Sequence, residues 1–251
     1  MADRSAESWY PTAAYLYVLH LDDLALAWEY LRRHPDYRRD WLRRRHQPDT
    51  ACSWGLRMLE DPAVDARDAH PAWLPGHPCT AQIHPDIDPP PDATAFEFWR
   101  IPGQKHLVHD GRRLMLATRW PGCCLRLTLA PGLEDGMAYV YAIRSCDMPC
   151  ARHCVLQAEL DKLAVAPEGT PAAVARPRPA PTTLQELHTL QALDATLAGA
   201  SLREIAEGLF GSDAVVKGWY ADGGLRSRVR RLVRRGLTLM RGGYRRLAQL
   251  K

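Results

Sequence analysis

The stretch GLRSRVRRLVRRGLTLMRGGYRRL, residues 224–247, decides the C-terminal part of the fold. It contains nine arginines and no acidic residue. At about 100° per residue, an α-helix places these side chains on two opposite faces. One face carries Leu225, Val229, Leu232, Val233, Gly236, Leu239 and Met240, and the other carries Ser227, Arg230, Arg231, Arg234, Thr238 and Arg241, with Arg226, Arg228 and Arg235 at the boundary. The pattern predicts a helix over residues 225–241 with an apolar back and a cationic front.

The cationic front lacks the mixed charges of an ordinary solvated helix. Such helices usually pair acids with bases four residues apart. Here arginines stand at that spacing, as in Arg226 with Arg230 and Arg231 with Arg235, and each pair repels by a few tenths of a kcal/mol. Arginine suits bidentate contact with phosphate and with guanine edges. The pattern favours nucleic-acid binding, with an acidic protein surface or plain solvent as the alternatives.

The residues before this helix predict a helical domain. Leu187, Leu190, Leu193 and Leu197 form an apolar stripe that Gly199 ends. Ser201 and Glu204 then have the spacing of a capping box, and the short helix that they open is typical of the first half of a helix-turn-helix. Residues 212–224, SDAVVKGWYADGG, leave two alternatives. They hold the second helix over residues 213–220, or they form an extended turn before residues 225–241, which the helical wheel favours.

The rest of the chain predicts an α+β protein. Residues 9–46 are aromatic-rich with helical spacing, and Pro35 separates two helices there. FEFWRI, RRLMLATRW, CLRLTLA and YVYAIR predict an antiparallel β meander, and a short helix follows over residues 152–164. We therefore expect a helical module over residues 1–75, a β-rich region over 92–165, a Pro/Ala linker over 166–183, and a helix-turn-helix domain over 184–251.

Charge is distributed unevenly along the 251 residues. The net charge is +4, but residues 182–251 hold twelve Lys or Arg against six Asp or Glu, a net of +6, so residues 1–181 sum to −2. This asymmetry predicts a polyanion partner for the basic end. No apolar run approaches the roughly 18 residues of a membrane span, and the N-terminus lacks a signal-peptide pattern. We expect a bacterial cytoplasmic protein, associated with the nucleoid when bound, and no membrane partner.

The cysteines and histidines give only weak candidates for a metal or catalytic site. The seven cysteines are an odd number, so no disulfide framework is expected in a cytosolic protein. A zinc site from Cys146, Cys150, Cys154 and His153 is an alternative, but the spacing is not the C-x-x-C of zinc ribbons. Buried, reduced thiols are favoured, and we expect no metal and no cofactor. His106, His109 and Asp110 form the one imaginable catalytic group, and we expect no enzyme.

Two segments carry a resemblance to a known family. Residues 192–211, ALDATLAGASLREIAEGLFG, with Trp219, LRSRVRRLVRRG and GGYRRL, resemble the C-terminal DNA-binding domain of transcriptional regulators on proteobacterial mobile elements. Residues 9–41, WYPTAAYLYVLHLDDLALAWEYLRRHPDYRRDW, are similar to the transcriptional regulator-like N-terminal domain of the same proteins. The chain resembles the FseA-type activators of excision of integrative and conjugative elements, strongly at both ends and weakly in the middle.

The resemblance implies an activator of excision and conjugative-transfer genes with an extended-turn helix-turn-helix. Its positive side, here Arg226, Arg230, Arg231 and Arg234, would meet DNA, with Arg245 and Arg246 at the tip. The opposite side would dock on the N-terminal domain through aromatics drawn from Trp9, Tyr15, Trp28, Tyr30 and Tyr37. Small acidic single-domain relatives take that docking place as antiactivators, so such a protein is an implied partner.

We therefore expect a binder of double-stranded promoter DNA that activates transcription through RNA polymerase. Ser227, Arg230 and Arg231 would read bases, while the other arginines of the segment, including Arg228, Arg235 and Arg241, would contact phosphates. About five neutralised phosphates would give a slope of log K against log salt of roughly −4 to −5. We expect a homodimer or a paired site. A repressor, a plasmid replication or partition regulator, and a protein-binding adaptor are the alternatives.

Overall fold

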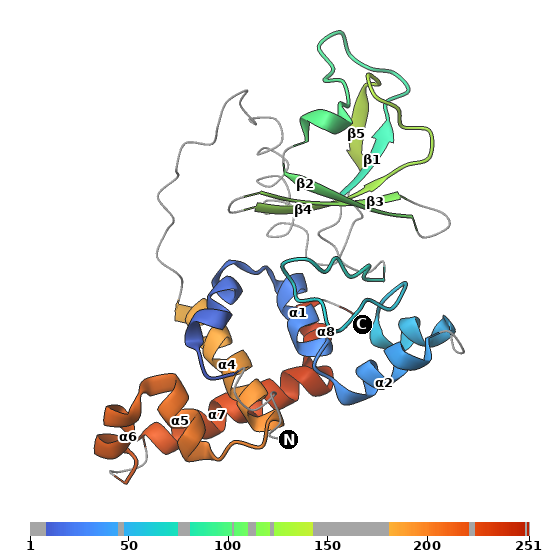
Figure 1. Ribbon diagram of the computed structural model, residues 1–251. Coiled ribbons are helices and arrows are strands. Elements are labelled where there is room, and N and C mark those ends of the chain that lie inside the picture. Colours follow the sequence, from blue (N-terminus) through green and yellow to red (C-terminus); the bar gives the residue numbers. More distant parts are fainter. Residues whose placement is uncertain are drawn as a thin grey trace. The chain divides into compact units, whose positions relative to one another are not determined.

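The computed structural model describes residues 9–44, 48–74, 81–101, 103–109, 114–120, 123–142, 181–220, 224–248 and 250. The fold is α+β, as predicted. The chain divides into two compact units (Figure 1). A helical unit is made from residues 1–54, 59–71 and 176–251, and a sheet unit from residues 55–58 and 72–175. The helical unit thus combines both ends of the chain, and the domain boundaries expected from the sequence stay predictions.

The N-terminal part of the helical unit consists of short helices. They are the 3-10 helix η1 (Thr12–His20), α1 (Asp23–Leu31), α2 (Pro35–Arg43) and the 3-10 helix η2 (Pro48–Trp54). Asp22 caps α1 by accepting a hydrogen bond from the Ala25 N–H at 2.8 Å. Pro35 occupies the first turn of α2, where its missing N–H costs nothing. The separation of two helices at Pro35 is confirmed.

The C-terminal part begins with a long helix and ends with a kinked one. Its elements are α4 (Pro181–Leu197), α5 (Leu202–Phe210), α6 (Ser212–Gly218), α7 (Gly224–Thr238), the π-helical turn η4 (Leu239–Gly243) and α8 (Tyr244–Leu247). The capping box of Ser201 and Glu204 is present. Gly199 and Gly211 follow α4 and α5 with φ angles of 85° and 86°, a conformation that favours glycine.

Two expectations for this part need correction. Most of the segment at residues 212–224 that we expected to be an extended turn is helical, because α6 covers Ser212–Gly218. The arginine-rich helix is present, but its regular α-helical part ends at Thr238 rather than at residue 241. The next residues widen into a π turn, inside which Gly242 adopts a φ of 138°. An L-residue rarely adopts such a φ, so this glycine permits the kink.

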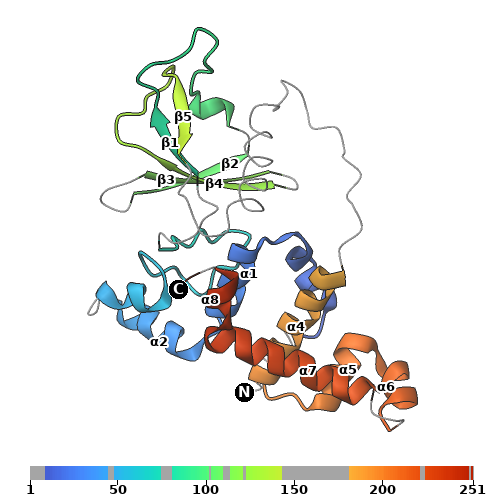
Figure 2. The same cartoon turned by 180° about the vertical axis from the view of Figure 1, so that it is seen from behind.

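The two ends of the chain share one core in the helical unit. Figures 1 and 2 show α4 alongside α7 and α1 alongside α8. Trp9 lies in a buried cluster with Ala192 of α4, Ile205 of α5 and Val229 of α7. A Cβ added to Gly208 would lie 2.6 Å from the Trp9 ring, so α5 accepts the indole only where it has no side chain. Gln191 fastens the same segment by donating to the Trp9 carbonyl at 3.1 Å.

The sheet unit is a five-stranded sheet with the order β2-β3-β4-β1-β5. The strands are β1 (Ala81–Pro85), β2 (Gln104–His109), β3 (Leu114–Trp120), β4 (Cys123–Leu129) and β5 (Tyr139–Ala142), and a 3-10 turn, η3, spans Phe98–Arg100. β2, β3 and β4 form an antiparallel meander. Leu125, Leu127 and Leu129 alternate along β4 into the core of this unit, as expected for a sheet with one buried face.

The expected meander is wrong at both of its ends. β1 and β2 were both missed. β1 lies parallel to β4 and antiparallel to β5, so β4 and β5 are not neighbours. FEFWRI, residues 96–101, is no strand. Its Phe98 N–H donates to the Asp135 carboxylate at 2.8 Å rather than to a strand partner. The predicted helix near residues 152–164 and residues 166–180 of the predicted linker lie outside the described residues, whereas the last linker residues, 181–183, are helical and begin α4.

Candidate nucleic-acid interface

α7 buries its apolar back and exposes its cationic front, as the sequence predicted. Val229, Leu232 and Gly236 are buried. The predicted front residues are all exposed, namely Ser227, Arg230, Arg231, Arg234, Thr238 and Arg241. One helix therefore presents a strip of guanidinium groups to solvent while its back joins the core.

Close packing against α4 fixes the position of α7. A Cβ added to Gly236 would lie 3.0 Å from the Leu193 Cβ and 3.2 Å from the Thr189 carbonyl oxygen. The two helices thus approach closely at the one buried residue of α7 without a side chain. Val229 and Leu232 add contacts to the shared core. The arginines are carried by a helix held along its back, which is the arrangement that a preorganised binding surface requires.

Six of the nine arginines have neither an ion pair nor a hydrogen-bond acceptor among the residues that the structure describes. These are Arg226, Arg230, Arg231, Arg234, Arg241 and Arg246, and all six are exposed. Like charges at this spacing repel each other. A bound polyanion would relieve that repulsion, and guanidinium forks match phosphate geometry.

The remaining three arginines are engaged within the chain. Arg235 pairs with Glu186 of α4, Arg245 donates to the Ser53 carbonyl, and the Arg228 guanidinium lies 4.7 Å from the centre of the Phe210 ring. Sequence spacing could not separate these three from the other six, because their partners lie on other helices.

The kink after α7 directs α8 toward the N-terminal part of the helical unit, where α8 lies alongside α1. At Gly243, an added Cβ would lie 2.9 Å from the Thr238 carbonyl oxygen, so the turn needs a residue without a side chain there. Tyr244 is buried, and its hydroxyl donates to the Trp54 carbonyl at 3.2 Å. The start of α8 is therefore anchored to the N-terminal part of the unit, which fixes where Arg246 and Leu247 lie.

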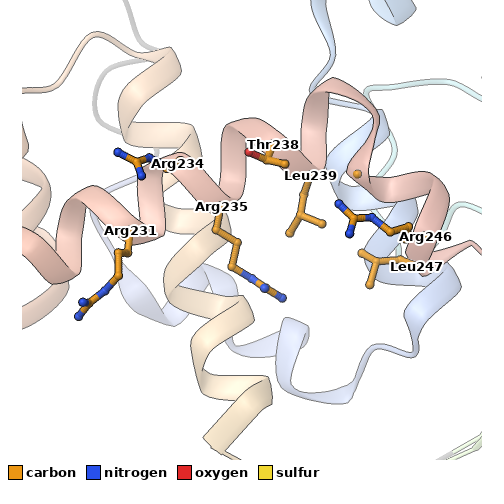
Figure 3. Close-up of a pocket in the computed structure, with 8 residues that line it drawn as sticks. Arg231, Arg234, Arg235, Thr238, Leu239, Arg246 and Leu247 are labelled. Carbon is orange, nitrogen blue, oxygen red and sulfur yellow. The ribbon is translucent and has the colours of Figure 1, made fainter.

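A pocket of about 400 Å³ lies at this kink. It is lined by Arg231, Arg234, Arg235, Thr238, Leu239, Gly243, Arg246 and Leu247. Figure 3 shows Arg246 reaching back from α8 toward Leu239, and Arg235 extending from α7. None of the described residues that line the pocket is acidic, so their polar character is cationic.

The five aromatics expected at a docking surface divide into two groups. Trp9, Tyr15 and Tyr30 contact the C-terminal helices: Trp9 packs in the shared core, and the two hydroxyls donate to Asp194 at 2.8 Å and to Glu186 at 2.7 Å. Trp28 and Tyr37 instead meet each other edge to face and donate to carbonyls of the N-terminal part, those of Val64 and Glu60. The docking role of the set stays a prediction.

A buried ionic network, which sequence reasoning missed, joins the two ends of the chain. It consists of Glu29, Arg33, Asp194 and Tyr15. Arg33 donates to both carboxylate oxygens of Asp194, at 2.6 and 2.8 Å, and also pairs with Glu29. Burial alone would raise the pKa of Asp194, but the charge of Arg33 and hydrogen bonds from Arg33 and Tyr15 hold that pKa below its ordinary value. Burial opposes a similar lowering of the Glu29 pKa by Arg33 and Arg32.

The other candidate sites receive little support. Cys146, Cys150, Cys154, His153 and Asp110 lie outside the described residues. His106 and His109 lie on β2, where a separation of three residues puts their side chains on opposite faces. Within the described ranges, no group of three or more His, Cys, Asp or Glu is placed to hold a metal ion. Of the helices in those same ranges, none is both long and apolar enough to span a membrane.

Three family models match successive parts of the chain. Residues 8–58 match a proteobacterial transcriptional regulator-like domain, residues 78–125 match a domain of unknown function, and residues 126–249 match the DNA-binding domain of a T6SS transcription factor. The matched domains indicate a DNA-binding transcription regulator. No curated protein matches the chain.

The matches agree with the geometry at both ends. The regulator-like match covers η1, α1, α2 and η2. The DNA-binding match begins within β4 and includes every helix from α4 to α8, so the cationic front of α7 lies in a domain similar to known DNA-binding ones. Both matched types are regulatory and generally non-enzymatic, and they support DNA as a partner of this transcription regulator.

Proposed function

We propose that this regulator is an activator that binds specific double-stranded promoter DNA through the front of α7. The observation that carries the proposal is the strip of exposed arginines that have no ion pair or hydrogen-bond acceptor within the described ranges, fixed on a helix whose back is buried. An isolated solvated helix would gain stability from acids at i,i+4 positions, and α7 contains none.

The contacts divide by their place on α7. Ser227, Arg230 and Arg231 lie in its first two turns, where a recognition helix meets base edges in the major groove. Arg226 and Arg234 flank them and contact phosphates, which position the helix without reading sequence. In this arrangement α5 is the first helix of a helix-turn-helix, α7 is the recognition helix, and α6 is a short helix inserted between them.

The contacts that some arginines make within the chain change the roles expected of them in DNA binding. Arg235 and Arg245 already donate to Glu186 and to Ser53, so their first role is to hold α7 and α8 in place. The Arg228 guanidinium stacks on the Phe210 ring, and its N–H groups donate to a phosphate of the DNA. Arg241 and Arg246 extend the cationic surface toward the kink.

Activation further requires a contact with RNA polymerase, and tight binding requires a homodimer or a paired site. The resemblance to FseA-type activators supports excision and transfer genes of a mobile element as the targets, a bacterial cytoplasmic location, and a small acidic antiactivator as a partner. The DNA-binding match is to a domain of a T6SS transcription factor, which favours secretion genes as a second set of candidate targets.

A titration of the full chain against pooled genomic fragments tests the proposal. The full chain is needed because Trp9 fills the core beneath α7 and Arg33 pairs with α4. We expect tight binding that is enriched in a few promoter fragments and has a slope of log K against log salt of about −4 to −5. The enriched fragments, fused to a reporter, separate the two target sets and distinguish an activator from a repressor by the sign of the change. An absence of DNA binding even at low salt would overturn the proposal and favour an adaptor with an acidic partner.

A further inference from the structure

The pocket at the kink after α7 has the chemistry of an anion site. Arg231, Arg234, Arg235 and Arg246 line about 400 Å³ of space, which is within the usual volume of ligand pockets. Glu186 offsets only one of the four charges. Arginine forks pair bidentately with phosphate and carboxylate, so an anionic ligand would relieve the repulsion among the other three.

The length of the pocket favours a ligand with more than one phosphate. From Arg231 to Thr238, the lining residues span seven positions of α7, or about 10 Å along the helix axis. A single carboxylate or phosphate could not reach both the Arg231 guanidinium at one end of this span and the Thr238 hydroxyl at the other. Consecutive phosphates in a nucleic-acid strand or in a phosphate anhydride could.

The chain holds the two sides of the pocket in a fixed relation. Gly242, with its φ of 138°, allows the turn, and the buried Tyr244 anchors α8, so Arg246 is brought beside an arginine helix that ended eight residues earlier. Leu239 and Leu247 provide an apolar wall, which lowers the local dielectric and strengthens ionic contacts. On the α7 side, the ion pair with Glu186 orients Arg235.

From this geometry we propose that the pocket is a phosphate-binding site for a ligand with at least two linked phosphates. The phosphates come either from the DNA backbone or from a free nucleotide or polyphosphate. The first source rests on the proposed function and adds a backbone clamp beyond the recognition helix. The second would make the site a regulatory one, because the ligand and DNA would compete for Arg231 and Arg234.

The test compares Arg246→Gln with Arg43→Gln in the full chain. Arg246 is exposed and lines the pocket, whereas Arg43 is an exposed arginine of α2 outside it, so both variants lose one surface charge. Inorganic triphosphate is titrated calorimetrically into each protein without DNA. For a free-phosphate site, we expect saturable binding that Arg246→Gln weakens at least tenfold and Arg43→Gln leaves unchanged.

The second arm measures the salt dependence of duplex binding. If the phosphates belong to DNA, triphosphate binds weakly or not at all, and Arg246→Gln reduces the slope of log K against log salt by about 0.9, while Arg43→Gln does not. A thermal melt of each variant shows that the fold is kept. The site is overturned if Arg246→Gln changes neither the triphosphate affinity nor the duplex salt slope. Wild-type protein that binds triphosphate but no DNA would keep the site and overturn the proposed function.

Discussion

Removal of the Asp194 carboxylate is the sharpest test of how the two ends of the chain are held together. Asp194→Ala takes away both acceptors of the Arg33 guanidinium and the acceptor of the Tyr15 hydroxyl. The Arg33 side chain is 7% exposed and the Asp194 side chain 24%, so water replaces the lost carboxylate only in part. The variant therefore leaves a buried charge with one remaining carboxylate, Glu29.

The magnitude follows from these contacts. Breaking a buried ion pair by removing one partner costs about 3–5 kcal/mol. Because Arg33 keeps Glu29, the ionic part falls near the lower end, and the unsatisfied Tyr15 hydroxyl adds about 1 kcal/mol. We expect a loss of roughly 3–4 kcal/mol in the free energy of unfolding of the helical unit, which is a large fraction of the stability of a typical domain.

Urea unfolding of the full chain, followed by far-UV circular dichroism, measures this loss. Glu207→Ala is the matched control, because it removes an acid that pairs with Arg203 on the surface of α5. We expect the control to change stability by at most about 0.5 kcal/mol. The double variant Arg33→Met with Asp194→Leu should be more stable than Asp194→Ala, since it removes the half-paired Arg33 guanidinium, while the Glu29 carboxylate keeps Arg32 and the Ala66 N–H as partners. A loss for Asp194→Ala no larger than that of the control would refute the reasoning.

Three further predictions concern α7 and the ionic network. Arg230→Ala combined with Arg234→Ala should lower DNA affinity and reduce the slope of log K against log salt by about 1 to 2, with the melting temperature unchanged. A large drop in melting temperature would instead mean that these arginines stabilise the fold. Gly236→Ala should destabilise by about 1–3 kcal/mol in urea unfolding, because its Cβ would crowd Leu193. Gly224→Ala is the control, because a Cβ added at Gly224 would meet no other heavy atom within 4 Å. We expect it to cause no loss of stability, and equal losses for the two variants would contradict the packing argument. The two carboxylates of the buried ionic network have lowered pKa values in the folded state. Their contribution to the free energy of unfolding is therefore present above about pH 4 and is lost as the pH falls through the folded pKa values. An unchanged free energy of unfolding down to about pH 2 would disprove this.

The candidate interface was largely predictable because its signals are local. The arginine front and apolar back of α7 follow from a 3.6-residue period, which relates residues within two turns of each other. The capping box of Ser201 and Glu204 and the stops at Gly199 and Gly211 also depend on neighbouring residues alone. Each of these features depends on residues that are close together in the sequence, and the structure confirms each of them.

The sheet was predicted less well, because strand pairing is set by residues far apart. The sequence pattern found β3 and β4, which a short connection joins, but it missed β2. β1 has only five residues and little apolar periodicity. It pairs with β4 and β5, whose residues lie more than 40 positions away in the sequence. FEFWRI has the composition of a strand, but the Asp135 carboxylate takes the backbone N–H of Phe98.

The sequence by itself determined the amphipathic arginine helix, its caps and its charge, because these depend on local spacing. Only the tertiary structure decided which arginines stay open to a ligand. Glu186 captures Arg235 across 49 residues, and the contact of Arg33 with Asp194 spans 161. The kink at Gly242 then places Arg246 beside α7. These residues come into contact only when the whole core of the helical unit has formed, because the free energy that stabilises their contacts comes from burying both ends of the chain together.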